Sequence, residues 1–282
     1  MKPVSEIIKL STEYLSKKDV ASPRRNADDI VANVLGCSRM DLYLDFERPL
    51  NEEEIQACRG FLKRRAKGEP LQYIFGSVAF YDCDIGVTPD VLIPRPETEI
   101  LVDKIASILV AEDLEGRVLW DICCGSGCIG IALKKRFPQL KVYASDICPR
   151  ALGVAKKNAD KNHADINFLE GSLLDPYFDQ ADYIVSNPPY IAESEYAGLE
   201  LEVRGFEPKK ALVAAQNGLA IYRYYAENMK DYLKLGGKIW LELGAGQGDL
   251  VLNIFKENRW QGSFFESDYA GNDRFFYAKR TF

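Results

Sequence analysis

Strand-like and helix-like segments alternate along the chain from residue 117 onward. Apolar, β-branched runs predict strands at RVLWDI (117–122), LKVYASD (140–146), INFLEG (166–171), DYIVSN (182–187) and GKIWLELG (237–244). Amphipathic runs predict helices at CIGIALKKRF (128–137), CPRALGVAKKNAD (148–160), Gly218–Leu235 and QGDLVLNIFKEN (247–258). Two closing strands are expected in SFFESDYAGNDRFFYAKR (263–280). This alternation predicts an α/β fold with a mostly parallel, doubly wound sheet and an antiparallel edge.

The residues before this region predict a different architecture. Helical patterns at 4–17, 22–37 and 51–68 indicate a small N-terminal helical bundle over residues 1–70. The third helix begins with acidic residues and ends with basic ones, as the helix dipole favours. Its basic face, RGFLKRRAKG (59–68), is either a solvated surface or a contact for RNA or an acidic partner. Residues 71–92 predict a β-hairpin connector, and residues 93–282 carry the sheet.

Composition narrows the classes of function. The chain has 282 residues, a net charge of −6 and a pI of about 5.1, whereas proteins that grip nucleic acid by its phosphates usually carry a basic surplus. We therefore expect no stable binding to nucleic acid. Apolar runs are too short to cross a membrane and the N-terminus lacks a signal-peptide core, so we expect a cytoplasmic protein, by default a monomer, that contacts no membrane.

The seven cysteines are expected to be free thiols, because their number is odd and nothing indicates export. His163 is the only histidine and the chain has no CxxC pair, so no metal site is predicted. The cluster formed by Cys123, Cys124 and Cys128 is interpreted as small packing residues.

A glycine-rich loop follows the first predicted strand of the sheet. Gly125-Ser126-Gly127-Cys128-Ile129-Gly130 satisfies GxGxxG, and Asp146 ends the next strand. Glycines let a backbone approach a ligand closely, and a carboxylate at a strand tip accepts hydrogen bonds from ribose hydroxyls. The pair predicts a cofactor that contains adenosine and leaves open which one it is.

The fourth strand ends in Asn187-Pro188-Pro189-Tyr190. Two prolines stiffen the backbone and remove two N–H donors, so the segment presents acceptors: the Asn187 side-chain oxygen and the Pro188 carbonyl. Two acceptors suit an NH2 group, and Tyr190 adds an aromatic face for a planar amide or base. Fixed dipoles of this kind favour methylation of a planar nitrogen. From these residues alone the substrate is a planar NH2 group, either an amide or a nucleobase.

The motifs DICCGSGCIGIAL (121–133), ASDICPRALGVAKKNA (144–159) and SNPPYI (186–191) resemble class I S-adenosylmethionine-dependent methyltransferases, which have a Rossmann-like mixed sheet. The chain as a whole resembles the PrmC/HemK family, the release factor glutamine methyltransferases. The matching stretches are GEPLQYIFGSVAFY (68–81), VLIPRPETEILVD (91–103), FEPKKALVAAQNGL (206–219), WLELGAGQG (240–248) and DYAGNDRF (268–275).

The resemblance implies methylation of the glutamine side-chain amide in the Gly-Gly-Gln motif of class-1 peptide chain release factors. It assigns catalytic roles to Asn187, Pro188 and Tyr190, and a substrate-binding role to these residues and Pro189. It implies that S-adenosyl-L-methionine is held by Cys123, Cys124, Gly125, Ser126, Gly127, Asp146, Leu173 and Asn187. Residues 93–282 would be the catalytic domain, and residues 1–70 would dock the release factor, which gives the basic face of residues 59–67 a use.

Two positions depart from the family pattern. Cys123 stands where relatives usually have glycine, which adds a Cβ and reduces freedom at positive φ. Ser172 stands where relatives commonly have aspartate, which removes an acidic group near the adenine. These departures leave the geometry of cofactor binding to be determined by the structure.

Three alternatives are weighed against this interpretation. A nucleic acid amino-methyltransferase would share NPPY, but the acidic pI and the absence of a basic target-recognition region argue against it. A ribosomal protein glutamine methyltransferase shares the motif and stays open. A non-catalytic cofactor-binding adaptor would not need an intact NPPY.

Overall fold

The computed structural model describes residues 2–281 and divides into two units. The first comprises the chain up to Gly76 together with Glu200–Phe206, and the second comprises Ser77–Leu199 together with the chain from Glu207 onward. The short segment Glu200–Phe206 therefore belongs structurally to the N-terminal unit although it lies far from it in the sequence.

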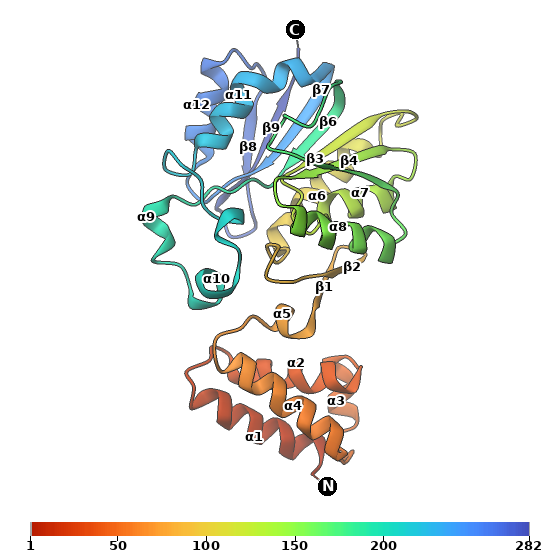
Figure 1. Ribbon diagram of the computed structural model, residues 1–282, viewed down its shortest axis with the longest axis vertical. Helices are drawn as coiled ribbons and strands as arrows, with labels where there is room; N and C mark the ends of the chain where they lie inside the picture. Colours follow the sequence, from red (N-terminus) through yellow and green to blue (C-terminus); the bar gives the residue numbers. More distant parts are fainter. Residues whose placement is uncertain (1, 282) are drawn as a thin grey trace. The chain divides into compact units, whose positions relative to one another are not determined.

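The first unit is helical, as predicted (Figure 1). Its helices are α1 (Val4–Ser16), α2 (Pro23–Leu35), α3 (Arg39–Leu44), α4 (Glu52–Arg65), α5 (Leu71–Phe75) and α10 (Leu201–Phe206). Helix α4 begins at a capping box in which Asn51 and Glu54 exchange side-chain and backbone hydrogen bonds. The buried core includes Ile8, Leu15, Ile30, Leu42 and Leu50. Apolar residues at helical spacing therefore meet in one interior, as the amphipathic pattern requires.

The basic face of α4 is partly used within this unit. Arg65 is buried; its guanidinium donates to Asn26 at 2.6 Å and forms an ion pair with Glu202 of α10. Arg64 pairs with Glu69. The predicted partner-contacting face is therefore smaller than expected, because two of its arginines hold this unit together. Its exposed members are Arg59, Lys63 and Lys67.

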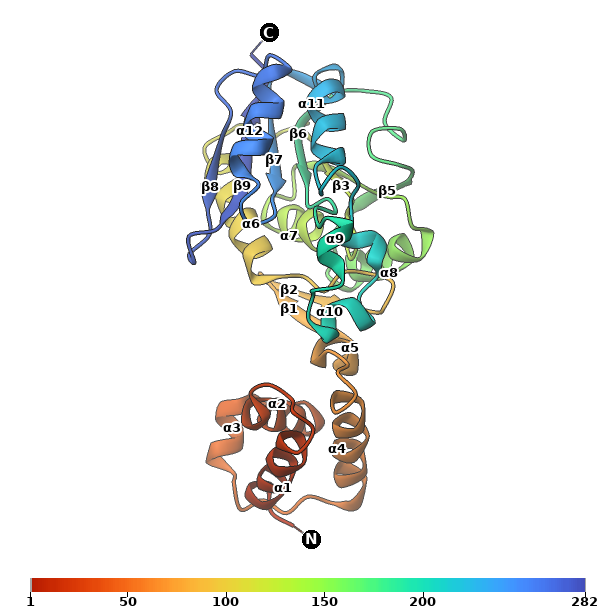
Figure 2. The same cartoon turned by 90° about the vertical axis from the view of Figure 1, so that its left-hand side faces the viewer.

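The second unit is an α/β layer structure (Figure 2). A hairpin of β1 (Ser77–Phe80) and β2 (Cys83–Gly86) precedes a 7-stranded sheet of order β5-β4-β3-β6-β7-β9-β8. Its strands are β3 (Val118–Ile122), β4 (Lys141–Asp146), β5 (Ile166–Glu170), β6 (Ala181–Ser186), β7 (Leu233–Glu242), β8 (Phe264–Ser267) and β9 (Asp273–Lys279). β5, β4, β3, β6 and β7 are parallel to one another, and β9 pairs antiparallel with β7 and β8. The predicted mixed sheet with an antiparallel edge is confirmed.

Helices cover both faces of the sheet. Those with the longest runs are α6 (Pro96–Leu109), α7 (Cys128–Arg136), α8 (Pro149–Lys161), α11 (Ala220–Tyr232) and α12 (Gly248–Glu257); α9 (Glu193–Tyr196) and the 3-10 turn η1 (Lys209–Ala211) are short. Alternate residues along β3 explain the two layers. Trp120 and Ile122 join the core cluster under α11 and α12, whereas Asp121 faces α7.

Three details differ from the sequence prediction. Leu71–Phe75 is helix α5 instead of part of the hairpin, because Pro70 starts a helical turn that Gly76 ends in the left-handed conformation. Helix α11 ends at Tyr232, and β7 begins at Leu233, before the predicted strand start. Residues 193–211, for which no element was predicted, contain α9, α10 and η1.

Candidate active site

Three parallel strands bring the predicted site residues to one edge of the sheet. Ile122 of β3 pairs with Ser186 of β6, so Cys123 and Asn187 emerge from neighbouring strands at the same level. Asp146 ends β4, the strand on the other side of β3. From β3 the strand order runs to one edge of the sheet through β4 and β5, and from β6 it runs to the other edge. The order therefore reverses between β3 and β6, and ligands of such sheets bind at that point, beyond the carboxyl ends of the strands.

A cavity of about 740 Å³ lies at this edge. This volume is in the range of small-molecule and cofactor sites. The predicted residues that line it are Cys123, Cys124, Gly125, Ser126, Asp146, Leu173, Asn187 and Pro189. Gly127, Pro188 and Tyr190 are adjacent in sequence but are not part of the lining.

The glycine loop has left-handed backbone at three positions. The φ angles are 60° at Cys123, 53° at Gly125 and 80° at Gly127. Cys123 therefore adopts the left-handed conformation that favours glycine. Its sulfur lies 3.8 Å from the Tyr225 hydroxyl and packs against the sheet core, a contact that a glycine lacks. Gly125 has open space where a Cβ would be, so its backbone borders the cavity directly.

Gly127 has a structural role beneath the cavity. A Cβ at this position would lie 3.2 Å from the Cβ of Ala155 in α8. It is also the N-cap residue of α7. Gly127 therefore allows α7 and α8 to approach each other, and its predicted contact with a cofactor remains a prediction.

The Asp146 carboxylate ties the tip of β4 to the glycine loop. Oδ2 accepts the Gly125 N–H at 2.9 Å and Oδ1 accepts the Cys148 N–H at 2.8 Å. Burial raises the pKa of Asp146 above its ordinary value, and these hydrogen bonds oppose the rise. Each oxygen keeps a further lone pair, so the carboxylate retains acceptor capacity toward the cavity.

Two acceptors of the NPPY segment have no donor among the described residues. Asn187 Nδ2 donates to Thr98 Oγ1 at 3.4 Å, and within residues 2–281 no donor reaches Asn187 Oδ1. The carbonyl of Pro188 likewise accepts no hydrogen bond from the described residues. Ser186 secures the base of the segment, because its hydroxyl donates to the Ile122 carbonyl at 2.7 Å. A rigid pair of unsatisfied oxygens is therefore present at the sheet edge.

The end of NPPY is held by residues from distant parts of the sequence. The Tyr190 N–H donates to the Leu212 carbonyl at 3.2 Å, and Gln247 Nε2 donates to the Tyr190 carbonyl at 3.0 Å. Gly218 passes so close that a Cβ there would lie 1.9 Å from the same carbonyl oxygen. Burial raises the pKa of Tyr190 to about 12, so its hydroxyl stays neutral. Its ring packs against the sheet core, and its expected place beside the substrate stays a prediction.

Two further segments line the cavity, although the sequence alone predicts no site role for them. They are the stretch from Pro89 to Thr98 and the stretch from Pro208 to Ile221. Glu207 joins them: its buried carboxylate accepts the Ile93 N–H at 3.1 Å and pairs with Arg95. The sequence feature that could have predicted their place in the site is that the motifs IPRPETE and FEPKKAL occur in the same chain as NPPY.

The thiols at the cavity are unsuited to act as nucleophiles. Burial raises the pKa of Cys123 to about 12 and those of Cys124 and Cys128 further above their ordinary value. In the described part of the chain, no group of three or more histidine, cysteine, aspartate or glutamate side chains is placed to hold a metal ion. None of the helices in that part is long and apolar enough to cross a membrane.

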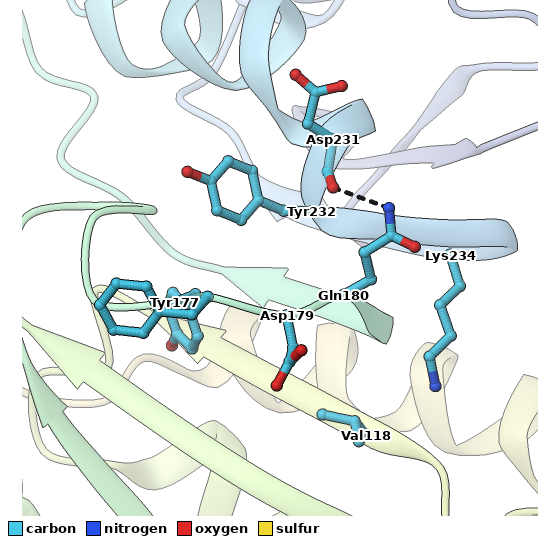
Figure 3. Close-up of a pocket in the computed structure, with 8 residues that line it drawn as sticks. Val118, Tyr177, Asp179, Gln180, Asp231, Tyr232 and Lys234 are labelled. Carbon is cyan, nitrogen blue, oxygen red and sulfur yellow. Dashed lines mark hydrogen bonds between the residues drawn. The ribbon is translucent and has the colours of Figure 1, made fainter.

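A second hollow, of about 790 Å³, lies at the opposite edge of the sheet (Figure 3). It is bordered by Val118 and Lys234, at the starts of β3 and β7, and Gln180 there donates to the Asp231 carbonyl at 2.9 Å. It contains none of the predicted residues, so we place the site at the carboxyl ends of the strands.

Comparison with known proteins identifies the family. The model of the PrmC N-terminal domain matches residues 6–76, and that of the methyltransferase small domain matches residues 97–201. The chain is 39% identical to the release factor glutamine methyltransferase of Geobacter sulfurreducens, over 96% of this chain and 94% of that one. It is 40% identical to the protein of the same name from Chlamydia trachomatis, over 98% and 94% of the two chains.

Among solved structures, a methyltransferase from Pyrococcus furiosus aligns with a TM-score of 0.52 and 20% identity, over 72% of this chain and 92% of that one, a likeness of fold. Because the sequence relationship to the curated relatives extends over nearly the whole of both chains, this chain belongs to the release factor glutamine methyltransferase family.

Proposed function

We propose that this protein transfers a methyl group from S-adenosyl-L-methionine to the side-chain amide nitrogen of the glutamine in the Gly-Gly-Gln motif of class-1 release factors. The observation that carries the proposal is a pair of acceptors without a donor among the described residues, Asn187 Oδ1 and the Pro188 carbonyl, in a segment whose Asn187 and Pro189 line a cofactor-sized cavity. The full-length relationship to release factor glutamine methyltransferases supports glutamine over a nucleobase as the substrate.

The residues of the cavity fit the cofactor. The open side of Gly125 allows close approach of a ligand to the backbone, and Asp146 offers acceptors for ribose hydroxyls. Cys123, Cys124, Ser126 and Leu173 add small and apolar surface on the same wall. Gly127 supports the loop from behind. When bound, S-adenosyl-L-methionine supplies an electrophilic methyl group on a sulfonium.

The protein's own contribution is orientation and fixed charge. An amide nitrogen is a poor nucleophile because its lone pair is delocalised into the carbonyl. Asn187 Oδ1 and the Pro188 carbonyl each accept one N–H of the substrate amide, which draws negative charge onto the nitrogen. The nitrogen would gain the methyl group as the methyl–sulfur bond breaks, which leaves a neutral thioether, and it would lose one of its two protons. Pro189 stiffens this frame, since it restricts Pro188 to extended backbone, and Tyr190 is proposed to border the substrate slot. Geometry and dipoles then provide the acceleration.

The partner is a release factor, and we propose that the N-terminal helical unit docks it. The exposed Arg59, Lys63 and Lys67 of α4 provide a basic surface for an acidic partner. We further propose a cytoplasmic, monomeric enzyme that forms no stable complex with nucleic acid. The net charge of −6 supports the last point.

The test mixes the protein and radiolabelled cofactor with intact release factor, a release factor whose motif glutamine is replaced, a ribosomal protein mixture, and RNA. Label should appear on the intact release factor alone. Label on RNA, on ribosomal proteins, or equally on both release factors would reject the proposed substrate.

A further inference from the structure

Asn187 can meet its substrate with either end of its amide. One end is an acceptor oxygen and the other is an NH2 donor of nearly the same shape. Only the oxygen suits a substrate NH2 group, because two NH2 groups facing each other present donor to donor. Some part of the protein must therefore select the end that faces the cavity.

Two buried side chains lie next to Asn187, and one of them, Thr98, also lines the cavity. Thr98 of α6 accepts from Asn187 Nδ2 at 3.4 Å, a long hydrogen bond, and its own hydroxyl donates to Glu242 Oε2 at 2.7 Å. Thr98 is 2% exposed and Glu242, at the end of β7, is 1% exposed. The chain of contacts thus runs from a carboxylate, through a hydroxyl, to the amide of the NPPY motif.

The chemistry of the hydroxyl makes this chain directional. A threonine has one O–H proton, and a carboxylate is an acceptor only. While Glu242 is ionised, it takes the proton of Thr98, so the Thr98 oxygen is left to accept. A group that only accepts requires the NH2 end of Asn187 to turn toward it. The Oδ1 end then faces the cavity.

We infer that Thr98 and Glu242 are positioning residues for methyl transfer, which orient the Asn187 amide so that its oxygen receives the substrate. The inference rests on the proposed function. It also assigns a purpose to two motifs that accompany NPPY in this chain, since Thr98 belongs to IPRPETE and Glu242 to WLELG.

The protonation state of Glu242 is central to this role. The titratable groups that face it are Glu97 of α6, Cys128 of α7, Arg274 of β9, Tyr190 and Tyr222. Burial raises the pKa of Glu242 to about 7; the hydrogen bond from Thr98 and the charge of Arg274 oppose the rise, and the charge of Glu97 adds to it. Below that pH the protonated carboxyl donates to Thr98, which frees the Thr98 proton to turn toward Asn187 and favours the wrong end of the amide.

The test compares Thr98→Val, which keeps the shape but removes the hydroxyl, with Thr98→Ser, which keeps the hydroxyl. At pH 8 we expect kcat for the release factor to fall about 10- to 100-fold in Thr98→Val, as for a misplaced reacting group, and to recover in Thr98→Ser. Cofactor affinity should fall less than kcat in both variants, because Thr98 borders the cavity but the glycine loop and Asp146, which are proposed to hold the cofactor, are unchanged.

A second variant separates positioning from stability. Glu242→Gln imitates the protonated carboxyl at every pH and removes a buried charge, so its melting temperature at pH 8 should not fall. Its kcat should be low at pH 8, and the decline that wild type shows below about pH 7 should be absent. A merely structural role predicts the reverse, with lower stability and an unchanged pH profile.

The possible outcomes test the proposed function and the positioning role separately. If wild type transfers no methyl group to the release factor, the proposed function fails. If wild type is active but Thr98→Val matches Thr98→Ser, or Glu242→Gln keeps the wild-type kcat and pH profile, the positioning role is overturned and the proposed function stands.

Discussion

Gly218→Ala should disrupt the NPPY segment from a position that is not part of the cavity lining. Gly218 has φ of 81°, and a Cβ there would lie 1.9 Å from the Tyr190 carbonyl oxygen and 2.8 Å from its carbon. Contacts of this kind stay above 3.0 Å in real proteins. One of the two backbone segments must therefore move by about 1 Å, and no side-chain rotation can relieve the overlap.

Gly116→Ala is the matched control for this variant. Gly116 has φ of 70°, and no atom lies within 4 Å of the place that a Cβ would take, so alanine there meets the backbone strain alone. That strain costs about 1–2 kcal/mol, equivalent to a fall of roughly 2–8 °C in melting temperature for a protein of this size class. The overlap at Gly218 should add about 1–3 kcal/mol to the same strain.

The activity difference is the sharper measurement. A displacement of about 1 Å at groups that orient a substrate lowers the rate by about 100-fold. We expect kcat/KM with release factor, at saturating cofactor, to fall by about that factor in Gly218→Ala and to stay within about twofold in Gly116→Ala. If Gly218→Ala retains more than half the activity of Gly116→Ala, the close approach to Tyr190 does not determine the position of NPPY.

Three further variants test other parts of the site and fold. Asn187→Ala should leave cofactor binding nearly intact and lower methyl transfer by about 100-fold or more, measured by calorimetry and label incorporation; transfer at the wild-type rate would contradict its role. Asp146→Ala should weaken cofactor binding, and unchanged affinity in calorimetry would remove it from the site. Burial opposes ionisation of Asp182, but hydrogen bonds from Lys234, the Val118 N–H and Arg117 hold its pKa below the ordinary 3.8. Its stabilisation is complete above pH 3.8 and is lost as the pH falls through the lowered value, so Asp182→Asn should unfold about 1–2 kcal/mol more easily than wild type at pH 7, and denaturant titration should find little difference near pH 2.

Several features of the fold follow from local patterns. The alternation of strands and helices predicted the parallel sheet, and the two closing strands expected within residues 263–280 predicted the antiparallel edge formed by β8 and β9. Local rules also explain the error at Leu71–Phe75, where aromatic and β-branched residues suggested a strand. Pro70 before that stretch and Gly76 after it are the end residues of a short helix. These two end signals outweighed the preference of the residues between them for a β-strand.

The functional groups of the site could be predicted from short motifs, because each motif contains its groups within a few residues. The glycine loop, Asp146 and NPPY each follow a strand, and strands that run parallel bring their ends to one edge of a sheet. Sequence order and strand direction were therefore enough to gather these residues at one site, and to predict a planar NH2 group as the substrate.

The way in which those groups are held depends on tertiary packing. Thr98 and Glu242 are 144 residues apart, and Gly218, Gln247 and Leu212 reach the Tyr190 backbone from outside its own segment. No local pattern encodes such contacts, because each depends on the packing of elements that are distant in the chain. The fold class and the reacting groups can thus be predicted from the order of the residues, whereas the end of the Asn187 amide that faces the cavity is set by packing.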